Sequence, residues 1–240
     1  ETSRLISTAP PVYRMRSEVM ELLAANAEHA DAFRSRFADV QDDQRPTAVT
    51  VTCSDSRVLA DHVWGNDEPG RLFTCSNIGN RVVQRTAEGE AVSGDVLYPL
   101  LHTGAEIAIV VGHTGCGAVT AAYDDLGEGL AEPPGIAHSV ELLTSHLEGG
   151  VERLPPDLSR SAAVNRLVEY NVDRQVDSLQ TSDDVPDGVT VVGVVYDFQD
   201  VYSGRRGEVH VVNVDGESTV GRLRKDHPEI TGRIRRLWEY

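Results

Sequence analysis

Two cysteines and one histidine stand at the ends of two short apolar segments. Cys53 ends the segment T-A-V-T-V-T-C, which begins at Thr47, while His113 and Cys116 follow the segment E-I-A-I-V-V-G, which begins at Glu106. Thiolates and imidazoles are the ligands that zinc prefers in proteins. A structural zinc site has four protein ligands, whereas a catalytic site has three and leaves the fourth position to water. The sequence offers three good ligands, which favours a catalytic zinc site.

The third cysteine, Cys75, ends the apolar segment R-L-F-T-C and leaves two alternatives open. It could supply a fourth ligand and close the site. Its spacing from Asn77 and Gly79 suggests instead that it lines the end of a neighbouring strand. A lone cysteine in a buried strand is usually a small hydrophobic core residue, and that is the interpretation we favour for Cys75.

An acid and a base follow the first ligand on the same turn. Asp55 and Arg57 lie two and four residues after Cys53, close enough together to pair. A carboxylate held by a guanidinium stays ionised and fixed in direction. Zinc lowers the pKa of a bound water to about 7, so Asp55 could accept its proton and orient the hydroxide. An ordinary surface ion pair is the alternative, but the position beside a metal ligand favours a catalytic pair.

Strands alternating with helices must position these residues. Continuous apolar, β-branched runs predict buried strands, and apolar residues at spacings of three and four predict helices. We therefore expect an α/β fold with a mainly parallel central sheet flanked by helices, in which the carboxyl ends of the strands line the site. The predicted strands cover residues 47–53, 71–75, 106–111 and 189–196, and the predicted helices cover residues 58–63, 93–103, 118–123 and 162–179.

The two ends of the chain extend this plan, and we expect a single domain over residues 1–240. An N-terminal helical arm is predicted for residues 1–43, with a helix from Ser17, which would be its cap. That helix could pack on a partner subunit or cover its own sheet. Residues 124–160 are expected to be an irregular insertion with a short helix near 137–147. An edge strand over 208–214 and a helical segment over 226–240, beginning near Pro228, complete the expected fold.

Four motifs of this chain resemble the β-class carbonic anhydrases. They are C-S-D-S-R from Cys53, G-H-T-G-C-G-A-V from Gly112, P-G-R-L-F-T-C-S-N-I-G-N from Pro69 and V-V-G-V-V-Y-D from Val191. The similarity extends over roughly residues 44–212. It implies a zinc lyase that reversibly hydrates carbon dioxide to bicarbonate and a proton, and that forms a homodimer or an assembly of dimers.

The resemblance also assigns roles to individual residues. It implies one zinc per chain on Cys53, His113 and Cys116, whose bound hydroxide is oriented by the pair of Asp55 and Arg57. The substrate pocket would be lined by Gln44 of the partner subunit and by Phe73, Ile78 and Tyr98. Without the family, Gln44 is simply a polar residue before a strand and Tyr98 a core residue of a helix.

Family members that switch off with bicarbonate, by placing the aspartate on zinc, carry tryptophan three residues before the first cysteine ligand. This chain has Thr50 there. The resemblance therefore implies the open, non-switching type.

Two other functions remain open. Ser76 stands where the family usually has arginine, so carbonyl sulfide or carbon disulfide could be the substrate of the same site. A non-catalytic, zinc-stabilised binding domain is the second alternative. It would need neither Asp55 nor Arg57, and the presence of both residues argues against it.

Composition limits the partners and the compartment. The formal charge of -16 and the single lysine, Lys225, argue against a nucleic-acid partner, because phosphate binding needs clustered cations. An acidic, lysine-poor surface suits a protein that works in concentrated salt, although a GC-rich genome would also replace lysine by arginine. No apolar run has membrane-spanning length, and three cysteines cannot all pair, so we expect a cytoplasmic protein without a membrane partner.

Overall fold

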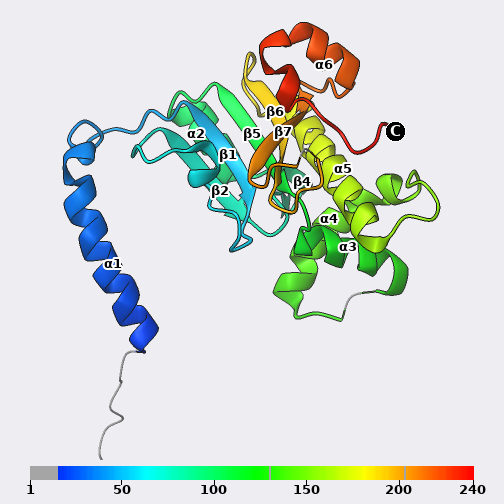
Figure 1. The fold of residues 1–240 in the computed structure, drawn as a ribbon, viewed down its shortest axis with the longest axis horizontal. Helices are drawn as coiled ribbons and strands as arrows, with labels where there is room; N and C mark the ends of the chain where they lie inside the picture. Colours follow the sequence, from blue (N-terminus) through cyan, green and yellow to red (C-terminus); the bar gives the residue numbers. More distant parts are fainter. Residues whose placement is uncertain (1–15, 130, 203) are drawn as a thin grey trace, which may run out of the picture. The chain divides into compact units, whose positions relative to one another are not determined.

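A five-stranded sheet forms the centre of the fold in the computed structural model, which describes residues 16–129, 131–202 and 204–240 (Figure 1). The strand order is β2-β1-β5-β6-β7, and every pair is parallel except β6 with β7. The strands are β1 (Ala48–Cys53), β2 (Leu72–Asn77), β5 (Ile107–His113), β6 (Thr190–Asp197) and β7 (Glu208–Val214). This architecture confirms the predicted α/β fold with its mainly parallel sheet and a C-terminal edge strand.

Strand register brings the predicted ligands to one edge of the sheet. All six residues of β1 are buried, as the continuous β-branched run predicted. Cys53 is the last residue of β1 and pairs with Asn77, the last residue of β2. β5 extends two residues further than predicted because His113 still pairs with Tyr196 of β6. The ligands therefore lie at the carboxyl ends of adjacent parallel strands.

Helices cover the sheet, and α5 is the one that contacts it most. α2 (Gly94–His102) packs on β1 and β2, whereas α5 (Arg160–Gln180) packs on β5, β6 and β7 and is itself contacted by α3 (Gly117–Glu128) and α4 (Pro134–Val151). The predicted apolar stripe of α5 is buried at Val164, Leu167, Val168, Val172, Val176 and Leu179. A hairpin of β3 (Val83–Thr86) and β4 (Gly89–Val92), which was not predicted, stands apart as a second sheet.

The expectation of an irregular insertion over residues 124–160 is right in part: the short helix predicted near 137–147 is the middle of α4, but helical structure extends beyond it on both sides. α3 runs on to Glu128, and α4 occupies Pro134–Val151. The glycines and acidic residues of this stretch hide an apolar face of α4, on which Val140, Leu143 and Leu147 recur at helical spacing and are buried. The short helix predicted over 58–63 is wrong, since a single 3-10 turn forms later, at His62–Trp64.

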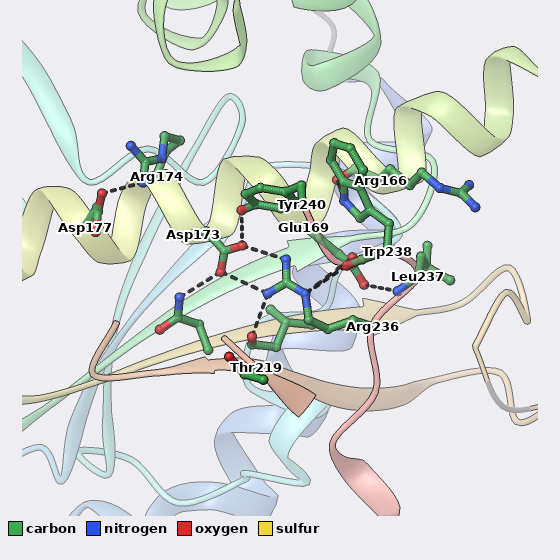
Figure 2. Close-up of polar contacts among 12 residues, drawn as sticks. Arg166, Glu169, Asp173, Arg174, Asp177, Thr219, Arg236, Leu237, Trp238 and Tyr240 are labelled. Carbon is green, nitrogen blue, oxygen red and sulfur yellow. Dashed lines mark hydrogen bonds and ion pairs between the residues drawn. The ribbon is translucent and has the colours of Figure 1, made fainter. Parts of the chain in front are cut away.

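The C-terminal segment differs from the predicted helix over 226–240. α6 (Val220–Asp226) and a 3-10 helix (Pro228–Arg233) precede residues 234–240, which are not helical (Figure 1). Arg236, Trp238 and Tyr240, at the period of two typical of an extended chain, all bond to α5 (Figure 2). A helix over this segment would turn these alternating side chains away from a common partner.

The chain divides into two units between Asp43 and Gln44. In the first unit, α1 (Ser17–Phe33) continues as a 3-10 helix (Arg34–Phe37), which confirms the predicted helix. Its cap is Arg16, because the Ser17 hydroxyl donates to Glu18 and caps no backbone group. No residue of α1 is buried. Residues 1–15 of the expected arm lie outside the described residues, and within the described chain no helix is long and apolar enough to cross a bilayer.

Candidate metal centre

The three predicted ligands converge at the carboxyl end of the sheet. Cys53 ends β1, His113 ends β5, and Cys116 is the cap residue from which α3 begins. One ligand atom from each of these buried residues lies within 4.8 Å of the other two. The three side chains therefore form a compact set of two sulfurs and one nitrogen that could hold a metal ion.

The spacing of the sulfurs suits tetrahedral zinc. The Sγ atoms of Cys53 and Cys116 are 3.9 Å apart. Zinc bonds of about 2.3 Å to two thiolates at a tetrahedral angle place the sulfurs about 3.8 Å apart. The two cysteines are free thiols, so both sulfurs are available as ligands.

The imidazole of His113 is also arranged for a metal. Its Nδ1 lies 3.0 Å from the carbonyl oxygen of Thr114, which makes Nδ1 the donor and leaves the lone pair on Nε2. Nε2 is buried and has no hydrogen-bond partner among the described residues. A buried acceptor without a hydrogen bond is energetically unfavourable. A metal ion bound to Nε2 would satisfy it, so this nitrogen beside two sulfurs fits a metal ligand.

The two thiols do not share the same proton affinity. A hydrogen bond from Cys116 and the nearby His113 lower the pKa of Cys53 to about 4, although burial opposes this change. The adjacent sulfur of Cys53 and burial raise the pKa of Cys116. Ionisation of Cys53 is therefore favoured over that of Cys116, and a metal cation would favour ionisation of both thiols.

Asp55 and Arg57 form the predicted pair beside this cluster. Arg57 donates from Nε to one carboxylate oxygen at 2.8 Å and from Nη2 to the other at 2.6 Å, which is a bidentate geometry. These hydrogen bonds hold the pKa of Asp55 well below its usual range. Asp55 Oδ2 is 3.8 Å from His113 Nε2, so the ionised carboxylate lies at the edge of the cluster.

A buried asparagine that the sequence did not indicate fixes the turn between two ligands. Asn165 of α5 accepts a hydrogen bond of 2.8 Å from the backbone nitrogen of Gly115. Arg57 donates a hydrogen bond of 3.2 Å to the carbonyl oxygen of Gly115. Gly115 has φ of +62°, and a Cβ there would lie 2.4 Å from the side chain of Gln199. The positive φ and the close Gln199 side chain favour glycine at this turn, and no sequence pattern points to Asn165 of α5 as the residue that holds it.

Of the residues predicted for the substrate pocket, Phe73 and Tyr98 are in ring contact. The rings of Phe73 and Tyr98 are 6.3 Å apart between centroids, so β2 and α2 do bring these two together. Tyr98 is 49% exposed and Ile78 39% exposed, and Gln44 is exposed as well. An exposed Tyr98 is not the core residue that its helix position alone suggested.

Cys75 belongs to the hydrophobic core. It is buried two residues before the end of β2, and its thiol donates to the carbonyl oxygen of Asp95. Burial raises the pKa of Cys75 to about 11, so it stays a neutral thiol. It is not one of the three clustered ligands.

Comparisons with known proteins agree on one family. The family model described as carbonic anhydrase matches residues 48–205. The carbonic anhydrase of Pseudomonas aeruginosa is 30% identical over 209 residues, which are 83% of this chain and 89% of that protein. The carbonic anhydrase of Helicobacter pylori strain J99 is 29% identical over 118 residues, and this match spans about half of each protein, 47% of this chain and 52% of the relative.

Solved structures show the same relation. The β-carbonic anhydrase CafA of Aspergillus fumigatus superposes with a TM-score of 0.67 and 25% identity, covering 92% of this chain and 100% of that chain. Together with the match over residues 48–205, this places the chain among the β-class carbonic anhydrases. The family and the type of enzyme implied by the sequence motifs are thereby confirmed.

Proposed function

We propose that this chain is a zinc-dependent carbonic anhydrase that interconverts carbon dioxide with bicarbonate and a proton. The observation that carries the proposal is the convergence of Cys53, His113 and Cys116 beside an ionised carboxylate. Zinc with three protein ligands keeps a fourth position for water and lowers the pKa of that water to about 7, which supplies a hydroxide nucleophile near neutral pH.

Asp55 and Arg57 would orient the nucleophile. The carboxylate of Asp55 accepts two hydrogen bonds from the Arg57 guanidinium and still has lone pairs to accept one more from a hydroxyl beside the cluster. Because its pKa is low, Asp55 accepts that hydrogen bond as a carboxylate throughout the neutral range. The pairing seen here supports the open, non-switching type, in which Asp55 stays on Arg57.

Apolar side chains would bind the apolar gas. Phe73 and Tyr98 offer adjacent rings, and Ile78 would add an aliphatic wall. In this proposal Gln44 of a second copy donates a hydrogen bond to the oxygen that becomes negative as bicarbonate forms. The exposure of Tyr98 and Ile78 is compatible with a pocket that a second copy completes.

Assembly and compartment belong to the same proposal. The β-carbonic anhydrases of Sordaria macrospora, which superpose with a TM-score of 0.66 at 20% identity, are described as tetrameric. We propose a homodimer or an assembly of dimers, and the exposed large apolar residues of α1, which include Val19, Met20, Leu22 and Leu23, support it. Free thiols and the charge of -16 support a reducing cytoplasm and tolerance of high salt.

Stopped-flow turnover of carbon dioxide, carbonyl sulfide and carbon disulfide tests the proposal. We expect zinc-loaded protein to act fastest on carbon dioxide, in low and in molar salt, and an Asp55→Ala variant with unchanged zinc content to lose most of this activity. Faster turnover of a sulfur-containing gas would change the substrate. Unchanged physiological function in Asp55→Ala, with unfolding of Cys53→Ala, would favour a zinc-stabilised binding domain.

A further inference from the structure

An aromatic ring lies between a metal-ligand candidate and the catalytic pair. Phe198 is the first residue after β6. Its ring stacks on the imidazole of His113, with centroids 5.5 Å apart and an angle of 25° between the planes. The Cζ atom of Arg57 lies 4.6 Å from the centroid of the same ring. One side chain thus contacts both halves of the candidate centre.

The backbone that carries Phe198 is firmly held. Asp197, which is fully buried, accepts hydrogen bonds from the backbone nitrogens of Gln199, Val201 and Tyr202 at 3.2, 2.8 and 2.8 Å. The Thr114 hydroxyl, next to His113, donates to Asp197 at 3.3 Å. The carboxylate therefore ties the loop after β6 to the turn after β5. The ring of Tyr196, 5.9 Å away and edge-on, limits the Phe198 ring further.

Arg57 needs such support. Its side chain is 50% exposed, while that of Asp55 is 15% exposed. Even in a bidentate ion pair, water and the rotamer entropy of a half-exposed arginine side chain oppose the pairing. Among the described residues, the carbonyl oxygen of Gly115 and the Phe198 ring also contact Arg57. A cation over an aromatic face is attracted to it, and the ring also removes water from one side of the guanidinium.

We propose that Phe198 is a positioning residue that keeps the Arg57 guanidinium on Asp55 and so keeps the carboxylate off the metal. This inference rests on the proposed function for its effect on activity. The interaction is a cation–π contact: the Arg57 guanidinium lies over the face of the Phe198 ring, and the same ring stacks on the imidazole of His113. A residue without a ring at position 198 would let Arg57 turn into solvent and free Asp55.

Two substitutions distinguish the effect of the aromatic face of Phe198 from the effect of its apolar volume. Phe198→Leu keeps an apolar side chain and loses the aromatic face, whereas Phe198→Tyr keeps the face. Phe33→Leu is a matched control, because Arg36 also lies 4.6 Å over the ring of Phe33, within the first unit of the chain. Thermal unfolding of each variant reports whether the fold is retained.

The position of Arg57 is read directly by ¹H–¹⁵N NMR of its Nε–Hε group, assigned with Arg57→Lys, in the zinc-loaded and in the metal-free protein. In the wild-type protein we expect the Hε resonance to be shifted by the ring current of Phe198. Phe198→Leu removes the ring that causes this shift and should also speed the exchange of Hε with water, because Arg57 turns into solvent; Phe198→Tyr should retain both the shift and the slow exchange. In carbon dioxide hydration, Phe198→Leu should lower kcat by about 3- to 10-fold with KM nearly unchanged, and Phe198→Tyr and Phe33→Leu should be near wild type.

A wild-type Arg57 resonance without a ring-current shift would overturn the inference, whether or not the variants fold. So would a Phe198→Leu variant that keeps wild-type kcat, or a Phe198→Tyr variant as slow as Phe198→Leu. Failure of the proposed function has a different signature, namely wild-type zinc protein that does not hydrate carbon dioxide while the Arg57 resonance still depends on the ring at position 198.

Discussion

A buried glutamate outside the metal centre makes the stability of this protein depend on pH. Glu169 lies on α5 beneath the C-terminal segment and is fully buried (Figure 2). Its Oε1 accepts hydrogen bonds from the Tyr202 hydroxyl at 2.7 Å and from the backbone nitrogen of Leu237 at 2.8 Å. Its Oε2 has no hydrogen-bond partner in the part of the chain that the structure describes. The nearest guanidinium, that of Arg236, is 3.9 Å from Oε2 and bonds to Asp173 instead.

Burial raises the pKa of Glu169 from its ordinary 4.5 to about 7, despite the opposing effect of Arg236. The folded state therefore binds the proton more tightly than the unfolded state does. The stabilisation is fully present below about pH 4.5 and is lost as the pH rises through about 7. Between pH 5 and pH 8 this loss amounts to about 2.5 kcal/mol of unfolding free energy.

Urea unfolding of zinc-loaded wild type and Glu169→Gln, at pH 5 and at pH 8, measures this term. Glutamine has the shape of glutamate and cannot ionise. From pH 5 to pH 8 the unfolding free energy of the wild type should therefore fall by about 2.5 kcal/mol more than that of the variant. Asp177→Asn, an exposed carboxylate on the same helix, is the control and should follow wild type. The reasoning would be refuted if the unfolding free energy of the wild type rose relative to that of Glu169→Gln toward pH 8, because the folded state would then favour ionised Glu169.

Three further perturbations have definite outcomes. Arg236→Met leaves the buried Asp173 without its guanidinium and should cost about 3–5 kcal/mol of unfolding free energy in urea; a loss below 1 kcal/mol would contradict this. Cys53→Ser should lower bound zinc, measured by elemental analysis, from one per chain to a small fraction, and full occupancy would exclude Cys53 as a ligand. Gly112→Ala places a Cβ 2.7 Å from Val172 and should cost about 1–3 kcal/mol, seen as a lower Tm; an unchanged Tm would show that α5 yields at this point.

The sheet and its main helix could be predicted because their signals are local. Strands buried on both faces require unbroken β-branched runs, and the stripe of α5 repeats at the helical period. The other face of α5 reads as an ordinary solvated surface. Glu169 and Asp173 are nevertheless buried, because Arg236 and its neighbours reach them from more than 60 residues further along the chain. A pairing at that distance leaves no local pattern.

The candidate site also contains residues that local sequence patterns predict and residues that they do not. Cys53 and His113 could be placed because strand ends in a parallel sheet share one edge. Asn165 and Phe198 could not be predicted, since each acts on a turn or side chain from another element of the fold. The extent of α4 was missed because glycine and acidic residues dilute its apolar spacing.

Zinc held by three protein ligands, with Asp55 kept on Arg57, is the arrangement on which the proposed activity depends. Its most direct test is a crystal structure of zinc-loaded protein near pH 7, with anomalous scattering measured at the zinc edge. We expect one zinc per chain, about 2.3 Å from the sulfurs of Cys53 and Cys116 and bonded to His113 Nε2, with solvent in the fourth position. A carboxylate oxygen of Asp55 on the metal, or zinc elsewhere in the chain, would contradict this arrangement.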